Sequence, residues 1–140
     1  VYGDGVLKEV LQQYIADNKL DKIVTLHGNQ PKEIVKETLK TAHFSILPSK
    51  SEGWPKAIAE SMFFGVIPIA TSVSCLAYML DFGNRGILME ANLNHDVIQI
   101  KNAIKDKVRL ETMSEKAANW SQSYTLDVFE TEISKLIHHS

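Results

Sequence analysis

The chain has 140 residues, of which 44% are hydrophobic and 23% are charged, and its formal net charge is −2. This composition is typical of one globular domain over residues 1–140, and it excludes a disordered or low-complexity chain. The slightly acidic balance excludes the basic surface of a general nucleic-acid-binding protein, so we expect no nucleic-acid partner. A single cysteine, Cys75, excludes a disulfide framework and indicates a reducing, cytoplasmic environment.

The first forty residues predict two strands and two helices in alternation. Residues 1–2 are typical of the end of a strand, and a glycine-rich turn follows them. A helix is expected over residues 6–18, where apolar residues recur at three- and four-residue steps. The β-branched run over residues 22–26 predicts a second strand, and a proline then opens a helix over residues 31–41.

The rest of the chain continues the alternation. Short apolar strands that alternate with helices predict an α/β fold, a Rossmann-like parallel sheet with helices on both faces. Ligands in such sheets bind beyond the carboxyl ends of the strands. Strands are expected at residues 44–47, 67–70 and 87–89, and helices at residues 56–62, 75–80, 96–120 and from Thr125 onward.

Two of these helices have an apolar face that we expect to be buried. In the helix over residues 6–18 this face is formed by Leu7, Val10, Leu11, Tyr14 and Ile15. In the final helix it is formed by Leu126, Phe129, Ile133, Leu136 and Ile137. No apolar run approaches the roughly 20 residues of a membrane span.

The central stretch, residues 44–71, predicts a strand, a polar loop, a helix and a second strand. Pro55 suits the first position of the helix, because its missing N–H costs nothing there. The free N–H groups of the first turn and the helix dipole together form a site for an anion. Gly53, which has no Cβ, lets a ligand approach the backbone closely.

Charged side chains flank this helix start. Lys56 adds a positive charge in the first turn, where contact with phosphate and exposure to solvent are equally expected. Glu52 and Glu60 would repel phosphate, but carboxylates accept hydrogen bonds from sugar hydroxyls. Phosphate at the amides with sugars on either side describes a nucleoside diphosphate sugar.

The run from Pro48 to Met62, P-S-K-S-E-G-W-P-K-A-I-A-E-S-M, resembles the signature of retaining GT-B glycosyltransferases of group 1, family 4. That signature has a serine-rich loop, a Glu-Gly-aromatic-Pro sequence and a second glutamate eight residues after the first. The resemblance implies the C-terminal, donor-binding domain of a retaining hexosyltransferase. Such an enzyme moves a hexose from a nucleoside diphosphate sugar to an acceptor hydroxyl, in polysaccharide or glycolipid biosynthesis.

The resemblance also implies roles for individual residues. Glu52 would be the catalytic residue near the donor hexose, and Glu60 would bind the ribose. Gly28 and Asn29 are expected to meet the base through the backbone. The diphosphate would lie at the backbone of Gly53, Trp54, Pro55, Lys56 and Ala57, with the Trp54 ring packing beneath the loop or lining the pocket.

No metal site and no cofactor are expected. The sequence contains no Asp-x-Asp motif, and the resemblance implies a family that does not need one. The sequence departs from the family pattern after the helix: the usual Gly-x-Pro is one residue longer here, Gly65-Val66-Ile67-Pro68. This departure concerns the packing between helix and strand rather than the donor loop.

The chain begins without a methionine, and we interpret it as a fragment of a longer protein. The resemblance implies that the first strand of this domain and the whole N-terminal acceptor domain are missing. Any association with the inner face of the membrane would come through that missing domain. The fragment alone is expected to be inactive.

Two alternatives remain at this point. One is another GT-B enzyme, such as a nucleotide-sugar epimerase, although those enzymes lack the pair of glutamates. The other is a flavodoxin-like, non-catalytic regulatory domain. Such a domain needs a phosphorylatable aspartate in an acidic cluster at the strand ends, and Asp4 is the only candidate.

Overall fold

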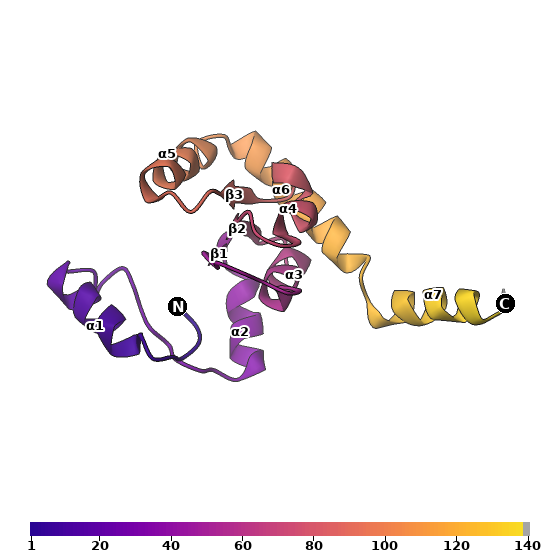
Figure 1. Ribbon diagram of the computed structural model, residues 1–140, viewed down its shortest axis with the longest axis horizontal. Helices are drawn as coiled ribbons and strands as arrows, with labels where there is room; N and C mark the ends of the chain where they lie inside the picture. The colour runs from indigo at the N-terminus through magenta and orange to yellow at the C-terminus, as the bar shows by residue number, and fades with distance from the viewer. Residues whose placement is uncertain (139–140) are drawn as a thin grey trace. The chain divides into compact units, whose positions relative to one another are not determined.

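The computed structural model describes residues 1–138, except the side chains of Leu126, Leu136 and His138. The chain divides into two compact units, Val1–Thr41 and Ala42–Ser140. The first unit contains α1 (Lys8–Asp17) and α2 (Lys32–Leu39). The second contains β1 (Phe44–Leu47), α3 (Lys56–Phe63), β2 (Ile67–Thr71), α4 (Leu76–Met79), η1 (Asp81–Gly83), β3 (Ile87–Met89), α5 (Leu93–Ala103), α6 (Lys107–Gln122) and α7 (Leu126–His138) (Figure 1).

In the first unit, the predicted strand over residues 22–26 is wrong. Residues 22 and 23 lie in a turn, and residues 24–26 have no regular secondary structure. The ladder is reduced to one parallel bridge between Tyr2 and Gly28, where the N–H of Gly3 donates to the Gly28 carbonyl at 2.8 Å. Ile23 is 80% exposed, so this segment buries too little apolar surface to sustain a strand.

Both apolar helix faces expected to be buried are instead largely exposed. In and just before α1, the side chains of Leu7, Val10, Leu11 and Tyr14 are exposed, Ile15 is half-buried, and no residue of the helix is buried. On α7, Phe129 is 63% exposed, and Ile133 and Ile137 are exposed as well. Leu126 and Leu136, the other two residues of that face, have side chains outside the described part. The helical period therefore predicted both helices but not the burial of their faces.

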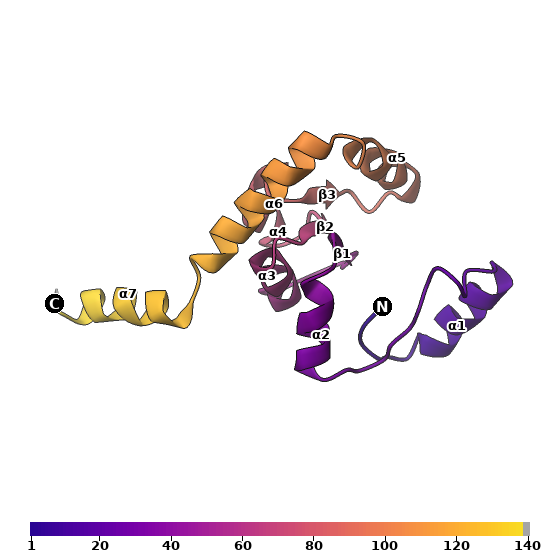
Figure 2. The same ribbon diagram turned by 180° about the vertical axis from the view of Figure 1, so that it is seen from behind.

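The second unit contains a three-stranded parallel sheet in the order β1-β2-β3. Figures 1 and 2 show β2 between the other two strands. Phe44 pairs with Ile67, and Ile69 pairs with Ile87. All five residues of β2 are buried, as expected for the central strand of a sheet covered on both faces. The α/β, Rossmann-like fold is confirmed.

Successive residues of β2 serve two separate cores, because side chains alternate across a strand. Ala70 packs in a cluster with α3, α4 and the Ala117 position of α6: Ile58, Met62, Ala70, Leu76, Met79, Leu80 and Ala117. Ile67 and Ile69 pack on the other face with Ile87, Met89 and Met113, and with Ile100 and Ala103 of α5. The two faces are thus covered by different helices, and α6 contributes to both.

The extra residue after α3 is accommodated by the way the helix ends. Gly65 has a φ of +74°, and its N–H donates to the Met62 carbonyl at 2.9 Å. The N–H of Val66 donates to the Ser61 carbonyl at 3.1 Å. This pair of bonds is the Schellman arrangement, in which a left-handed glycine satisfies the last carbonyls. Val66 is fully buried, so the longer connection closes the helix without disturbing its packing.

Pro68 lies inside the central strand without costing a ladder bond. The N–H of Ile67 donates to the His43 carbonyl on the β1 side at 3.0 Å. Successive residues of a strand point their backbone groups to opposite sides, so the Pro68 nitrogen faces the β3 side. Pairing with β3 begins only at Ile69. The missing N–H of proline is therefore tolerated at this position.

None of the helices within residues 1–138 combines the length and the apolar composition that crossing a bilayer requires.

Candidate functional site

The candidate site lies where β1 and β2 end. β1 ends at Leu47, and the loop of residues 48–55 leads from it into α3; we call this segment the donor loop, after the role that the resemblance implies for it. β2 ends at Thr71, and residues 72–75 lead from it into α4. Because the two strands are parallel neighbours, both loops leave the same edge of the sheet. That edge is where α/β sheets bind ligands.

Two hydrogen bonds join these loops. The N–H of Glu52 donates to the Ser74 hydroxyl at 3.3 Å. The thiol of Cys75 donates to the Gly53 carbonyl at 3.0 Å. The residues joined are 22 positions apart in the sequence. The backbone on both sides of the Glu52–Gly53 peptide is therefore fixed by the loop that follows β2.

The start of α3 offers unpaired N–H groups, as predicted. Pro55 is the buried N-cap, and no side chain of the described residues caps the helix. The intrahelical bonds begin with the N–H of Ile58, which donates to the Pro55 carbonyl at 3.0 Å. The N–H groups of Lys56 and Ala57 therefore precede the intrahelical ladder. Together with the helix dipole, these are the groups that the sequence predicts to bind an anion.

Glu60 lies one helical turn after Lys56, about 6 Å along the axis. The Lys56 Nζ is 3.9 Å from Glu60 Oε1, and the lysine side chain is 78% exposed. Exposed pairs of this kind contribute little to stability. In this conformation the ammonium lies towards Glu60, and the α3 amides are the groups left for a phosphate.

Glu52 and Gly53 lie in the middle of the donor loop. Glu52 is half-buried and Gly53 is exposed. A Cβ built on Gly53 would meet nothing within 4 Å, and Gly53 does not have a positive φ. The packing of the protein therefore does not require glycine here. The space over Gly53 is available to a ligand.

Trp54 packs against aromatic residues at the end of α6, and it remains 55% exposed. Its ring centroid lies 6.3 Å from that of Trp120 and 6.4 Å from that of Tyr124. The packing interpretation of Trp54 thus fits the geometry. Sequence reasoning missed Trp120 and Tyr124. Tyr124 lies beyond the end of α6 at Gln122, so no helical pattern along the chain indicated this pair.

The residues predicted to meet the base, Gly28 and Asn29, belong to the first unit. Gly28 is buried with a φ of +64°. Its carbonyl accepts a hydrogen bond from the N–H of Gly3, within the bridge that it forms with Tyr2. Asn29 is exposed. His27, the residue before them, stacks on Tyr2 with ring centroids 4.7 Å apart.

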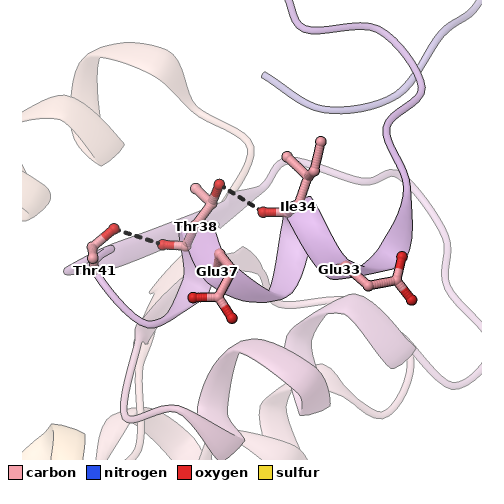
Figure 3. A pocket seen from close by; sticks show the side chains of 5 residues that line it. All are labelled: Glu33, Ile34, Glu37, Thr38 and Thr41. Atoms are coloured by element: carbon pink, nitrogen blue, oxygen red, sulfur yellow. Dashed lines mark hydrogen bonds between the residues drawn. The ribbon is translucent and has the colours of Figure 1, made fainter.

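A hollow of about 410 Å³ on α2 is a weaker candidate for an anion (Figure 3). Its lining includes two acids, Glu33 and Glu37, which repel phosphate. Its hydroxyls are already bonded within the helix region: Thr38 donates to the Ile34 carbonyl at 3.0 Å, and Thr41 donates to the Thr38 carbonyl at 3.1 Å. The repulsion by the two acids and the bonded state of the two hydroxyls therefore disfavour a phosphorylated ligand here.

Within the described residues, no three His, Cys, Asp or Glu side chains are placed to hold a metal ion together. That the transfer needs no metal ion stays a prediction.

Comparison with known proteins identifies the family of this chain. The sequence profile described as "Glycosyl transferases group 1" matches residues 1–123. An uncharacterized glycosyltransferase of Methanocaldococcus jannaschii is 27% identical over 124 residues, which are 88% of this chain and 35% of that protein.

Two solved structures have the same fold. Sucrose-phosphate synthase from Thermosynechococcus elongatus matches with a TM-score of 0.82 at 19% identity, over 98% of this chain and 35% of that one. HepE of Anabaena, solved in complex with UDP and glucose, matches with a TM-score of 0.79 at 17% identity, over 99% of this chain and 40% of that one.

The chain spans between 35% and 40% of the length of these three proteins. The structural likeness assigns the fold of the C-terminal domain of GT-B glycosyltransferases. The profile covers most of the chain. The chain therefore belongs to the group 1 family of glycosyl transferases.

Proposed function

We propose that the donor loop and the start of α3 bind the diphosphate of a nucleoside diphosphate sugar, whose hexose is transferred to an acceptor hydroxyl with retention. The observation that carries the proposal is the helix start without a side-chain cap, next to two hydrogen-bonded loops. Support also comes from the HepE structure, which was solved in complex with UDP and glucose. A uridine nucleotide is therefore the first donor to test.

The N–H groups of Lys56 and Ala57 would bind the diphosphate, and the open backbone at Gly53 lets it approach. When the hexose leaves, negative charge develops on the diphosphate. Amides that are fixed before the reaction stabilise such charge without reorganisation, which is the usual electrostatic contribution to catalysis. The N–H groups at the start of α3 would make this contribution.

Glu52 and Glu60 would bracket the diphosphate. Glu52, on the half-buried loop tied to Ser74, would accept hydrogen bonds from the hexose and act at the reacting carbon. Glu60, one turn into the helix, would accept hydrogen bonds from the ribose hydroxyls. Gly28 and Asn29 would contact the base. The acceptor would be held by a further domain, and polysaccharide or glycolipid biosynthesis is the proposed setting.

The proposed function is tested by calorimetric titration with UDP-glucose, GDP-glucose and ADP-glucose. One nucleotide should bind, and Glu60→Gln should weaken that binding. Glu52→Gln, assayed in the full-length enzyme, should lower turnover on the order of a hundredfold while the thermal unfolding midpoint stays unchanged. Glu111→Gln, an exposed glutamate on α6, is the matched control. Near-normal turnover of Glu52→Gln would contradict the proposal.

The family match favours this function over the regulatory alternative. Asp4, the one candidate for a phosphorylated residue, already pairs with Lys8 at 3.0 Å and accepts a hydrogen bond from the N–H of Gly5 at 2.9 Å.

A further inference from the structure

Three rings meet beside the donor loop, and we call Trp54, Trp120 and Tyr124 the aromatic cluster. Trp120 and Tyr124 are closest, with ring centroids 4.6 Å apart. Trp54 lies 6.3 Å from Trp120 at an interplanar angle of 34°. Aromatic pairs at these separations are each worth about 0.5–1.5 kcal/mol beyond the apolar area they bury. The cluster therefore ties the donor loop to the end of α6.

A cation lies against the cluster on the side of Trp120. The guanidinium carbon of Arg85 is 4.7 Å from the centroid of the Trp120 ring. The Arg85 side chain is only 13% exposed, and its Nη2 is 3.8 Å from Asp81 Oδ1. Its Nη1 is buried without a hydrogen-bond partner. A buried donor left unpaired is costly, so contact with the Trp120 ring is a main compensation for burying this charge.

The base of the Arg85 side chain is held rigidly. The N–H of Arg85 donates to the Leu80 carbonyl at 2.9 Å. The next residue, Gly86, is buried so tightly that an added Cβ would lie 2.8 Å from the Pro68 carbonyl oxygen. Arg85 is thus fixed two residues before β3 begins, and its guanidinium lies against the ring of Trp120.

These contacts form a continuous path from β3 to the donor loop. Arg85 contacts Trp120, Trp120 contacts Trp54, and Trp54 directly follows Glu52 and Gly53 in the sequence. On its other side the loop has the hydrogen bonds from Ser74 and Cys75. We propose that Arg85 and Trp120 are positioning residues, which set the conformation of the donor loop through Trp54.

This inference rests on the proposed function for its catalytic meaning, but the conformation of the loop can be measured without any ligand. A purely structural role for the aromatic cluster would change the stability of α6 and leave the donor loop as it is. A positioning role changes the loop in a protein that is still folded. The two roles therefore predict different results for the backbone amides of Glu52 and Gly53.

The test compares Trp120→Ala, Trp120→Phe and Arg85→Met with the wild type and with Lys116→Ala, an exposed control on α6. In nitrogen-15 spectra without ligand, we expect Trp120→Ala and Arg85→Met to shift the amides of Glu52 and Gly53 and the indole N–H of Trp54. Trp120→Phe retains a ring and should restore wild-type positions. With UDP-glucose, Trp120→Ala should weaken binding by about tenfold. This loss corresponds to the free-energy cost of ordering one or two additional side chains when the ligand binds.

If Trp120→Ala and Arg85→Met leave the loop amides where the Lys116→Ala control has them, the positioning role is wrong. If Trp120→Ala does not fold, Arg85→Met decides the question, because it keeps the aromatic cluster and removes the guanidinium that lies against Trp120. If the wild type binds none of the three nucleotide sugars, the proposed function fails, while the spectra without ligand still decide the positioning role.

Discussion

The thiol of Cys75 donates a hydrogen bond of 3.0 Å to the carbonyl oxygen of Gly53. The bond joins the loop after β2 to the loop after β1, directly beside the carboxylate proposed to be catalytic. The thiol sulfur also lies 3.8 Å from the Met79 sulfur in the core. Cys75 thus connects the hydrophobic core to the backbone of Gly53 in the donor loop.

Replacing Cys75 should have small effects on both binding and folding. Cys75→Ala removes the donor to Gly53, and since a thiol is a weak donor, we expect a loss of UDP-glucose affinity of only about threefold, with an unfolding free energy changed by about 1 kcal/mol or less. Cys75→Ser keeps a hydroxyl donor and should bind as the wild type does. Calorimetric titration and urea unfolding of both variants check this. Equal affinity of Ala and Ser variants would show that the bond is not used.

Two glycines give a matched pair with opposite expected effects. Gly53→Ala places its Cβ in open space, so the unfolding free energy should change by about 0.5 kcal/mol or less. Gly86→Ala would bring its Cβ to 2.8 Å from the Pro68 carbonyl oxygen, and overpacking of this kind costs about 1–3 kcal/mol. Urea unfolding measures both values.

The same pair separates binding from stability. Gly53→Ala should weaken UDP-glucose binding by about tenfold, the equivalent of 1.4 kcal/mol, because the added methyl group occupies the approach of the diphosphate. Gly86→Ala acts on the donor loop only through its neighbour Arg85, so it should lose stability mainly and lose less affinity than Gly53→Ala does. A Gly53→Ala variant with wild-type affinity would mean that the space above this peptide is not used by the ligand.

The packing of α6 on α3 includes buried hydroxyl contacts. Ser121 is buried and donates a hydrogen bond of 2.6 Å to the Ala59 carbonyl. Ser121→Ala should therefore destabilise the fold by about 1–2 kcal/mol, the cost of losing a buried hydrogen bond. Ser123→Ala loses a bond to the carbonyl of its own helix neighbour, Trp120, at an exposed position. In the same urea titration, the Ser123→Ala control should lower the unfolding free energy by less than half as much as Ser121→Ala does.

A pH dependence is expected in the first unit. The side-chain hydrogen bond from Lys8, with a further one from the N–H of Gly5 and the charge of Lys8, holds the pKa of the Asp4 carboxyl below its usual value. A lowered pKa in the folded state means that this interaction stabilises the fold above the ordinary aspartate pKa. The contribution is lost as the pH falls through the lower, folded value.

Carbon-13 spectra of the Asp4 carboxyl during an acid titration measure this pKa directly. Lys8→Met removes both the hydrogen bond and the charge, so the pKa should rise towards its usual value. Gln13→Met, on an exposed part of α1, is the control and should leave it unchanged. An Asp4 pKa that does not respond to Lys8→Met would contradict the pairing.

Much of the second unit could be predicted from its sequence, because its strands are short apolar runs bounded by proline or glycine. The strand at residues 44–47 is confirmed, as are those at residues 67–70 and 87–89, with one residue added to the second. The expected helix over residues 96–120 is two helices, α5 and α6. The signal was present: Asp106 caps α6 by accepting a hydrogen bond from the N–H of Arg109 at 3.0 Å.

The candidate site was predictable only where it is local in sequence. Gly53, Pro55 and the start of α3 follow from turn and helix chemistry within ten residues of one another. Ser74, which accepts the bond from Glu52, and Trp120, which packs on Trp54, lie far along the chain. Their roles depend on which strands are neighbours and on where α6 ends. No local pattern carries that information.

The claim that the start of α3 binds a diphosphate is tested most directly by titrating nitrogen-15-labelled protein with UDP-glucose. We predict that the largest shift changes occur at the backbone amides of Gly53, Trp54, Lys56 and Ala57. Amides that stay in place while saturating UDP-, GDP- and ADP-glucose are added, or shifts confined to α2, would contradict the account.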